Sequence, residues 1–398
     1  MKISEKVIII AILSVVSVCG FAQTSPSIID EESYQSAILR QSLSDRTNII
    51  STAVPLLTIT PDSRAAGMGD VGVATTPDAN SNHWNAAKLA FADKKISASF
   101  TYSPWLRDIV GDIDLAYLAG YYKLDAKSAI GFSLTYFSLG NIQFTDQQGS
   151  SLGIYSPNEF AIDLSYSMKL NENLSASVTG RYIRTDLTQG QNIGTTSTHA
   201  ANAVAADLGL YYQKDIAAEK PQQMAFGLQI SNLGNKMSYS NDDVESSFLP
   251  TNLRIGGRYT YNMDQFNKFS FMLDLNKLLV PTPPYRNDND SIIAGREDNV
   301  NVVKGIFQSF YDAPDGFSEE LKEVMVSIGG EYWYNDMLAV RAGYFYENEK
   351  KGDRQYITMG LGLKYNSLGV EVAYLVPTTS HNTNPLKNTL RVSLSFDF

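Results

Sequence analysis

Histidine and cysteine, which serve as catalytic groups and metal ligands, are rare in this 398-residue chain, with three histidines and one cysteine. The three histidines, His83, His199 and His381, are far apart, and no H-E-x-x-H or nucleophile–base motif accompanies them. The run 287–290, Asn-Asp-Asn-Asp, lacks the glycine and the terminal glutamate of an EF-hand calcium loop. We therefore expect no enzyme, no metal site and no cofactor.

Three glycines, Gly67, Gly69 and Gly72, have the G-x-G-x-x-G spacing of a dinucleotide-binding loop. Such a loop must follow a strand and open the helix of a βαβ unit. Pro61 and Arg64 stand where that strand should be. The sequence favours another role, in which small residues let this segment pack closely inside the lumen of a barrel.

The N-terminus has the three parts of a secretory signal peptide. Two lysines precede an apolar run over 7–18, which is too short to span a bilayer, and small residues follow up to Ala22. We predict removal of the signal peptide, 1–22, which leaves a mature chain without cysteine or disulfide. The alternative is a lipoprotein anchored through Cys19, although the valine before it is not the small residue that lipidation signals prefer.

The charge balance excludes several kinds of partner. The chain has 42 acidic and 32 basic residues and a net charge of −10. Nucleic-acid binding and docking on anionic lipid both require a basic surface. The mean hydropathy of −0.17 excludes a bundle of membrane helices. It is compatible with a membrane β-barrel, because barrel strands expose only every second side chain to lipid.

From about residue 95 onward, apolar and polar residues alternate in runs of about ten, the length of a tilted strand that crosses the hydrocarbon layer. In one run Phe160, Ile162 and Leu164 alternate with Asp163 and Ser165. Fourteen such runs are present, at 96–104, 112–124, 129–144, 159–170, 174–186, 203–214, 224–233, 252–262, 268–280, 324–334, 337–347, 355–365, 368–376 and 388–398.

The connections between these runs differ in length by parity. Those after even-numbered runs are short, such as 125–127 and 366–367, and those after odd-numbered runs are mostly long, up to 281–323. Outer-membrane barrels have short periplasmic turns and long external loops. We therefore predict an all-β fold, a fourteen-stranded antiparallel barrel over 96–398 in the outer membrane. An even strand number puts both chain termini in the periplasm and the long loops outside.

The last run ends the chain on an aromatic residue. Phe396 and Phe398 lie on its apolar face, while Ser395 and Asp397 lie on the other. A terminal aromatic residue in phase with the lipid face is similar to the insertion signal of outer-membrane barrels. We predict that Phe396 and Phe398 serve this purpose.

Residues 23–95 precede the barrel and are not strand-like, with helical character over 31–43. Two stretches resemble the N-terminal hatch, a periplasmic or luminal plug, of the FadL-like barrel superfamily. They supply the hatch candidates Arg64, Gly67, Gly69, Asp70, Asn82, Trp84 and Asn85. With the motifs at 75–80, 103–107 and 112–121, the whole mature chain resembles the PorV family of the type IX secretion system. Ala86 departs from this pattern, since the family usually has proline there.

The resemblance implies a function in protein export. It implies that the barrel binds the C-terminal signal domain of cargo at a SprA-type translocon. It further implies delivery of the cargo to a PorU-type sortase and attachment complex, without catalysis by this chain. Its other contacts would be with outer-membrane lipid. The alternative is a FadL-type transporter that passes hydrophobic molecules through the lumen, with the hatch as its gate.

The longest connection, 281–323, contains an apolar helical face. With Tyr311, this face supplies the candidate cargo- or partner-binding residues Val300, Val303, Ile306, Phe307, Phe310 and Tyr311. An apolar helix face in an external loop is expected to cover either the barrel's own mouth or a partner's surface.

Overall fold

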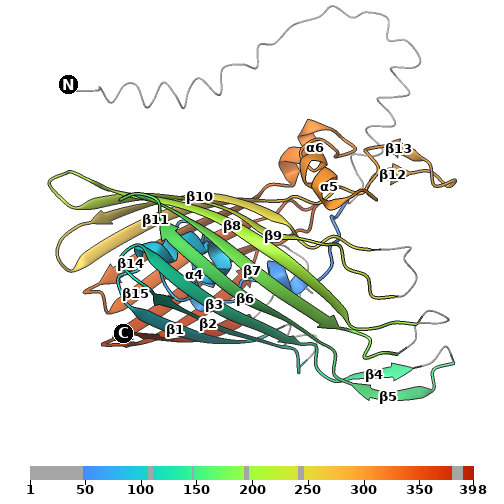
Figure 1. Ribbon diagram of the computed structural model, residues 1–398, viewed down its shortest axis with the longest axis horizontal. Coiled ribbons are helices and arrows are strands. Elements are labelled where there is room, and N and C mark those ends of the chain that lie inside the picture. The colour runs from blue at the N-terminus through green and yellow to red at the C-terminus, as the bar shows by residue number, and fades with distance from the viewer. Residues whose placement is uncertain (1–47, 106–110, 146–147, 192–196, 241–245, 379–388) are drawn as a thin grey trace, which may run out of the picture. The chain divides into compact units, whose positions relative to one another are not determined.

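The computed structural model describes residues 48–105, 111–145, 148–191, 197–240, 246–378 and 389–398. Fourteen antiparallel strands form one closed barrel, and β1 pairs with β18 to close the ring (Figure 1). The barrel strands are β1 (Ile96–Pro104), β2 (Asp114–Lys123), β3 (Ser128–Ser138), β6 (Asn158–Lys169), β7 (Leu174–Asp186), β8 (Ala201–Ile216), β9 (Gln222–Gly234), β10 (Asn252–Asn262), β11 (Asn267–Leu278), β14 (Met325–Tyr334), β15 (Leu338–Tyr346), β16 (Gln355–Tyr365), β17 (Leu368–Pro377) and β18 (Leu390–Asp397). The predicted fold class is confirmed.

The strands bury polar side chains and expose apolar ones, which is the reverse of a soluble sheet. In β6, Asp163 and Ser165 are buried, whereas Leu164 between them is 65% exposed. In β18, Arg391 is buried and Val392 is exposed. This alternation gives an apolar outer face for lipid and a polar inner face toward the lumen.

One predicted strand is wrong in its extent. The run 129–144 is divided, because β3 ends at Ser138 and β4 (Ile142–Thr145) pairs with β5 (Ser151–Tyr155) in a separate hairpin. Gly140 lies between the two parts with a φ of 75°, a left-handed conformation that turns the chain out of the barrel wall.

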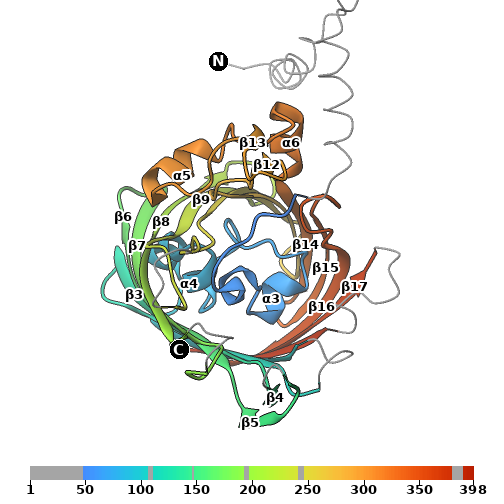
Figure 2. The same ribbon diagram turned by 90° about the vertical axis from the view of Figure 1, so that its right-hand side faces the viewer.

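The described part of the hatch, residues 48–95, lies inside the ring of strands, where Figure 2 shows α3 and α4. It contains four short helical elements: η1 (Pro55–Thr58), α3 (Ser63–Ala66), α4 (Ser81–Trp84) and η2 (Ala86–Phe91). Their contacts are with the barrel wall: η2 packs on β3, β6, β7 and β8, and α3 packs on β16, β17 and β18. The predicted helix over 31–43 lies outside the described residues.

The connection between β11 and β14 forms a small subdomain outside the ring of strands, and for that position it is called the external subdomain. It contains the hairpin of β12 (Tyr285–Arg286) and β13 (Ile292–Ala294), followed by α5 (Val302–Gln308) and α6 (Phe317–Lys322). Figure 1 shows α5 and α6 at the end of the barrel opposite to the C-terminus. Among the residues described, no helix is long and apolar enough to cross a membrane.

Candidate functional site

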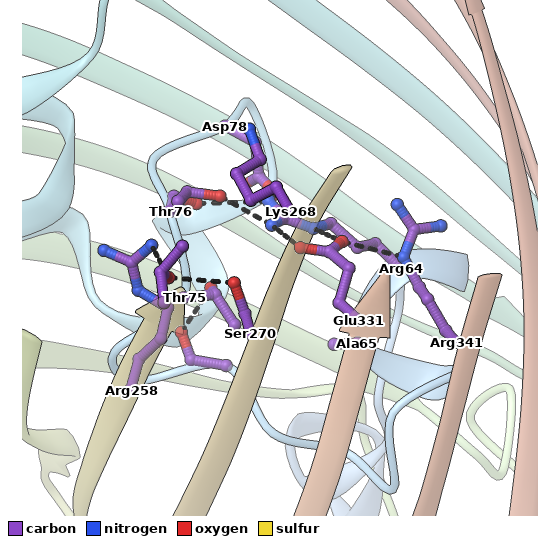
Figure 3. A network of polar contacts seen from close by, with 12 residues as sticks. Arg64, Ala65, Thr75, Thr76, Asp78, Arg258, Lys268, Ser270, Glu331 and Arg341 are labelled. Atoms are coloured by element: carbon purple, nitrogen blue, oxygen red, sulfur yellow. Dashed lines mark hydrogen bonds and ion pairs between the residues drawn. The ribbon is translucent and has the colours of Figure 1, made fainter. Parts of the chain in front are cut away.

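Arg64 is the central cation of the hatch, and it binds the barrel wall (Figure 3). Its Nε and Nη2 donate to the two carboxylate oxygens of Glu331 on β14, at 3.0 and 2.9 Å. Its Nη1 donates to Asp78 at 2.8 Å. This bond joins α3, which contains Arg64, to the segment that leads into α4. Arg341 on β15 donates to the same Glu331 at 2.9 Å. All of these groups except Asp78 are buried, so this bidentate pair is shielded from water.

Asp62 organises the hatch around Arg64. Its carboxylate accepts from the backbone N–H of Ala65 at 2.9 Å and so caps α3. It also accepts from Trp84 Nε1 at 2.7 Å, which fixes α4 against α3. Sequence inspection missed Asp62, although an aspartate immediately before the serine that opens α3 is a recognisable N-cap signal.

The hatch glycines contact the barrel backbone directly. A Cβ on Gly67 would lie 2.9 Å from the Cα of Gly360. Gly69 has a φ of 68°, and a Cβ there would lie 2.5 Å from the backbone nitrogen of Tyr344. The N–H of Gly69 donates to Thr358 Oγ1 at 2.8 Å. This N–H group therefore binds the wall instead of a phosphate, in agreement with the predicted close packing in the lumen.

The remaining hatch candidates each reach a different part of the wall. The hydroxyl of Tyr356 donates to Asp70. Asn82 donates to the carbonyl of Gly120 at 2.9 Å and accepts from Ser165 at 2.7 Å. Asn85 donates to the carbonyl of Leu210 at 2.9 Å. The asparagines therefore bind backbone carbonyls of the strands β2 and β8 and tie the hatch to the wall there.

Ala86, where the family pattern has proline, still begins a helical turn. The side chain of Asn85 accepts from the N–H of Ala87 at 3.1 Å and caps η2. Lys88, which sequence inspection also missed, is buried within this turn and donates to the Gly72 carbonyl at 2.6 Å. A lysine in a largely apolar segment gives no sequence signal of burial.

A cavity of about 140 Å³ lies beside the hatch, on the side where the long connections between strands begin. Its walls combine apolar side chains such as Phe345 and Leu375 with Arg181, Arg254 and Arg391. The guanidinium of Arg391 lies 5.3 Å from the centre of the Trp105 ring. This cavity is small compared with the lumen that the hatch fills. Its volume is about that needed to hold one benzene molecule.

The external helices present apolar side chains to solvent. Val303 and Phe307 on α5 are 66% and 67% exposed, and Phe317 and Leu321 on α6 are 76% and 58% exposed. Of the other predicted loop residues, Phe310 and Tyr311 are exposed, Ile306 is half-buried and Val300 is buried before the start of α5. The expected apolar face exists, but most of it faces away from the barrel.

The polar face of α6 is buried instead. Lys277 on β11 binds Glu320 at 3.0 Å and Glu323 at 2.5 Å. Lys351 from the β15–β16 loop binds Glu319 at 2.6 Å and Glu323 at 2.9 Å. Although burial opposes it, the hydrogen bond from Lys351 lowers the pKa of Glu319. These ion pairs fix the orientation of α6 with its apolar face outward.

Asp312 adds a fourth carboxylate beside this cluster. Its Oδ2 accepts from the N–H of Thr282 at 3.3 Å, and the hydroxyl of Thr282 donates to Glu323 at 2.6 Å. Burial raises the pKa of Asp312 to about 6, and the nearby Glu320 and Glu323 add to this rise. Asp312 therefore keeps its proton to a higher pH than an exposed aspartate.

Comparison with solved structures finds outer-membrane barrels of low identity. The Ralstonia pickettii toluene transporter TbuX is 13% identical, with 85% of this chain and 98% of that chain covered and a TM-score of 0.46. The Pseudomonas putida toluene transporter TodX is 11% identical, with 88% and 98% covered and a TM-score of 0.47. A Pseudomonas aeruginosa FadL homologue is 10% identical, with 88% and 100% covered and a TM-score of 0.42.

No curated protein sequence matches the chain. A family model described as "Type IX secretion system protein PorV" matches residues 41–285, which include most of the hatch and the strands from β1 to β11. On this match, over more than half of its length, the chain belongs to the PorV family of type IX secretion system proteins.

Proposed function

We propose that this outer-membrane barrel binds the C-terminal signal domain of secreted cargo at a SprA-type translocon and carries it to a PorU-type sortase and attachment complex. In this proposal the long loops face the cell exterior and the short turns face the periplasm. The chain performs no catalytic step, and its external loops hold the cargo. Membership of a secretion family supports this class of function.

The observation that carries the proposal is the outward apolar face of α5 and α6. A helix that buries glutamates and exposes phenylalanine and leucine is inverted relative to an ordinary surface helix. Phe317 and Leu321 are exposed on α6, while Glu319, Glu320 and Glu323 beside them are buried. An exposed apolar face held in place by buried ion pairs is typical of a binding surface.

The size of this surface suits a reversible complex. Full burial of one large apolar side chain contributes about 1.5–3 kcal/mol, so four such side chains contribute roughly 6–12 kcal/mol. Association costs about 4–15 kcal/mol in lost freedom. The two sums are of similar size, which favours a partner that is bound and then released. A shuttle needs this behaviour.

The transporter alternative receives less support. The hatch binds the wall through Arg64, Gly69, Asn82 and Asn85, each directed at different strands. A gate for small molecules would have to break many of these bonds in each cycle.

The test replaces the exposed apolar side chains without touching the ion pairs. The variant carries Val303→Ser, Phe307→Ser and Phe317→Ser, and the matched control carries Lys304→Ser and Ser318→Ala on the same helices. We expect cargo with an uncleaved signal domain to accumulate several-fold in the variant only, measured by immunoblot. Uptake of a lipophilic dye should be unchanged.

Equal amounts of folded barrel, measured by heat-modifiable mobility in electrophoresis, are required for the comparison. Normal cargo processing in the variant would overturn the role of this surface. Reduced dye uptake with normal processing would favour the transporter.

A further inference from the structure

The cavity beside the hatch has an excess of positive charge. Four arginines line it, Arg181, Arg254, Arg354 and Arg391, and Asp70 is the single acidic residue among its described lining residues. The chain as a whole has a net charge of −10, so composition does not account for this concentration of cations. The charge of the wall favours an anionic ligand.

Two of these arginines are neutralised within the protein. Arg181 binds Asp163 at 2.6 Å and Asp207 at 3.1 Å. Arg354 binds Glu347 at 2.7 Å. Each of these guanidinium groups therefore already has a carboxylate partner.

Arg391 on β18 has no such partner among the described residues. It is 3% exposed, no described carboxylate or hydrogen-bond acceptor binds its guanidinium, and its Nε is buried and unpaired. The guanidinium stacks on the ring of Trp105. Stacking on an aromatic ring offsets only part of the cost of burying a cation, and buried charges in proteins are normally paired. A buried, unpaired guanidinium that lines a cavity therefore indicates that an anion binds there.

Arg254 on β10 adds a second cation that lacks a carboxylate partner in the described part of the chain. Its Nε donates to Asn276 Oδ1 at 2.6 Å and its Nη1 donates to Gln229 Oε1 at 3.2 Å, and both acceptors are neutral. Its guanidinium lies 4.7 Å from the centre of the Trp84 ring in the hatch. With the two paired arginines set aside, the described lining retains two cations against the one carboxylate of Asp70.

The apolar part of the wall restricts the kind of anion. Met325, Phe345 and Leu375 pack in one cluster with Tyr356, and all four line the cavity. The volume of about 140 Å³ is that needed for one benzene molecule. Arginine binds carboxylate and phosphate groups alike. Inorganic phosphate would make no use of the apolar wall, whereas a carboxylate with a small apolar body uses both parts of the site.

We propose that this cavity binds a small carboxylate whose apolar body is about the size of one benzene ring, and that Arg391 pairs with its carboxylate group. The apolar body lies against the cluster around Phe345. Leu57, Ile59 and Trp84 of the hatch also line the cavity, so the ligand contacts both the hatch and the wall. This site does not depend on the proposed cargo binding, and it requires no passage of the ligand through the lumen.

Benzoate is the probe for this site. Benzamide is its neutral analogue, and inorganic phosphate is an anion without an apolar part. Binding to the folded mature chain in a non-ionic detergent is measured by isothermal titration calorimetry. The variants are Arg391→Met, Arg391→Lys and the control Arg184→Met, which removes an arginine on β7 that does not line the cavity.

We expect benzoate to bind the unsubstituted chain about tenfold or more tightly than benzamide, because hydrogen bonds to charged groups are the stronger ones. Arg391→Met should weaken benzoate binding by about 10- to 100-fold. Arg391→Lys should keep part of the affinity, since it keeps the charge, and Arg184→Met should keep all of it.

Equal binding of benzoate and benzamide would overturn the proposal, as would unchanged benzoate binding by Arg391→Met. Tighter binding of phosphate than of benzoate would overturn the class of ligand. A measurement without ligand gives an independent check, because removal of an unpaired cation should not destabilise the protein. The thermal midpoint of heat-modifiable mobility should fall for Arg341→Met, which loses its ion pairs to Glu331 and Glu371, but not for Arg391→Met. An equal fall for both variants would show that the protein itself binds the Arg391 guanidinium, which contradicts the proposal.

Discussion

Replacing Arg64 with methionine should loosen the hatch while the barrel remains closed. The substitution keeps an unbranched apolar stem but removes the guanidinium and with it the bonds to Glu331, Asp78 and Thr76. Loss of one partner from a buried ion pair costs about 3–5 kcal/mol. Glu331 keeps Arg341 at 2.9 Å, so the lower end of this range, about 3 kcal/mol, applies.

Hydrogen exchange of the hatch amides measures this loss directly, because exchange reports the free energy of local opening. A loss of about 3 kcal/mol corresponds to roughly 100-fold faster exchange. The amides of Ala65 and Gly69 are suitable probes, since Ala65 binds Asp62 and Gly69 binds Thr358 in the closed hatch. Amides in β6 and β7, on the far wall, should not change.

The control is Lys268→Met, which removes an ion pair to Asp336 at 2.8 Å. This pair is at the surface, since the side chain of Lys268 is 37% exposed and that of Asp336 is 80% exposed. Exposed pairs contribute about 0–1 kcal/mol, so this variant should exchange at nearly the original rate. Equal acceleration by Lys268→Met and Arg64→Met would refute the reasoning. Additive effects of Arg64→Met and Glu331→Gln would refute it as well, since two residues that bind each other should be coupled.

Two further predictions concern the hatch backbone and the external subdomain. Gly69→Ala should destabilise the hatch by about 2–6 kcal/mol, from left-handed strain and from the clash with Tyr344, each of which costs about 1–3 kcal/mol. Gly149→Ala, with a φ of 82° and open space around it, should cost only about 1–2 kcal/mol, and the thermal midpoint of heat-modifiable mobility compares the two. The pKa of Asp312 in the folded protein, about 6, exceeds its ordinary value of 3.8. Its stabilisation of the subdomain is therefore complete below pH 3.8 and is lost as the pH rises through about 6. Limited proteolysis between β12 and α6 should accelerate over this range, and Asp312→Asn should remove most of that dependence.

The barrel could be predicted from the sequence because membrane strands have a local signature. Alternation such as that of Leu164 between Asp163 and Ser165 appears in the sequence, and each strand pairs with the next barrel strand in chain order. The break at Gly140 was missed, since the apolar residues of β4 continue the same alternating pattern. Only the pairing of β4 with β5 shows that they belong to another sheet.

The orientation of α6 could not be predicted, because it depends on distant residues. The sequence shows an apolar and an acidic face but does not say which one is buried. Lys277 and Lys351 decide this, and they lie in β11 and in the β15–β16 loop. The wall partners of Arg64 are distant in the same way, since Glu331 is 267 residues further along the chain.

The hydroxyl of Ser393 on β18 lies where the barrel closes. It is 2.6 Å from the hydroxyl of Thr101 on β1, accepts from the N–H of Ser63 in the hatch at 3.0 Å, and donates to the Ser63 hydroxyl at 2.8 Å. The first and last strands meet only after every other strand has been made. We therefore expect the hatch to be in place before the seam closes, because the same hydroxyl joins β18 both to β1 and to the hatch. A barrel that closed before the hatch was bound would leave the Ser393 hydroxyl without its partner Ser63. The pairing of β1 with β18 is therefore expected to be more stable when the hatch is already in the lumen.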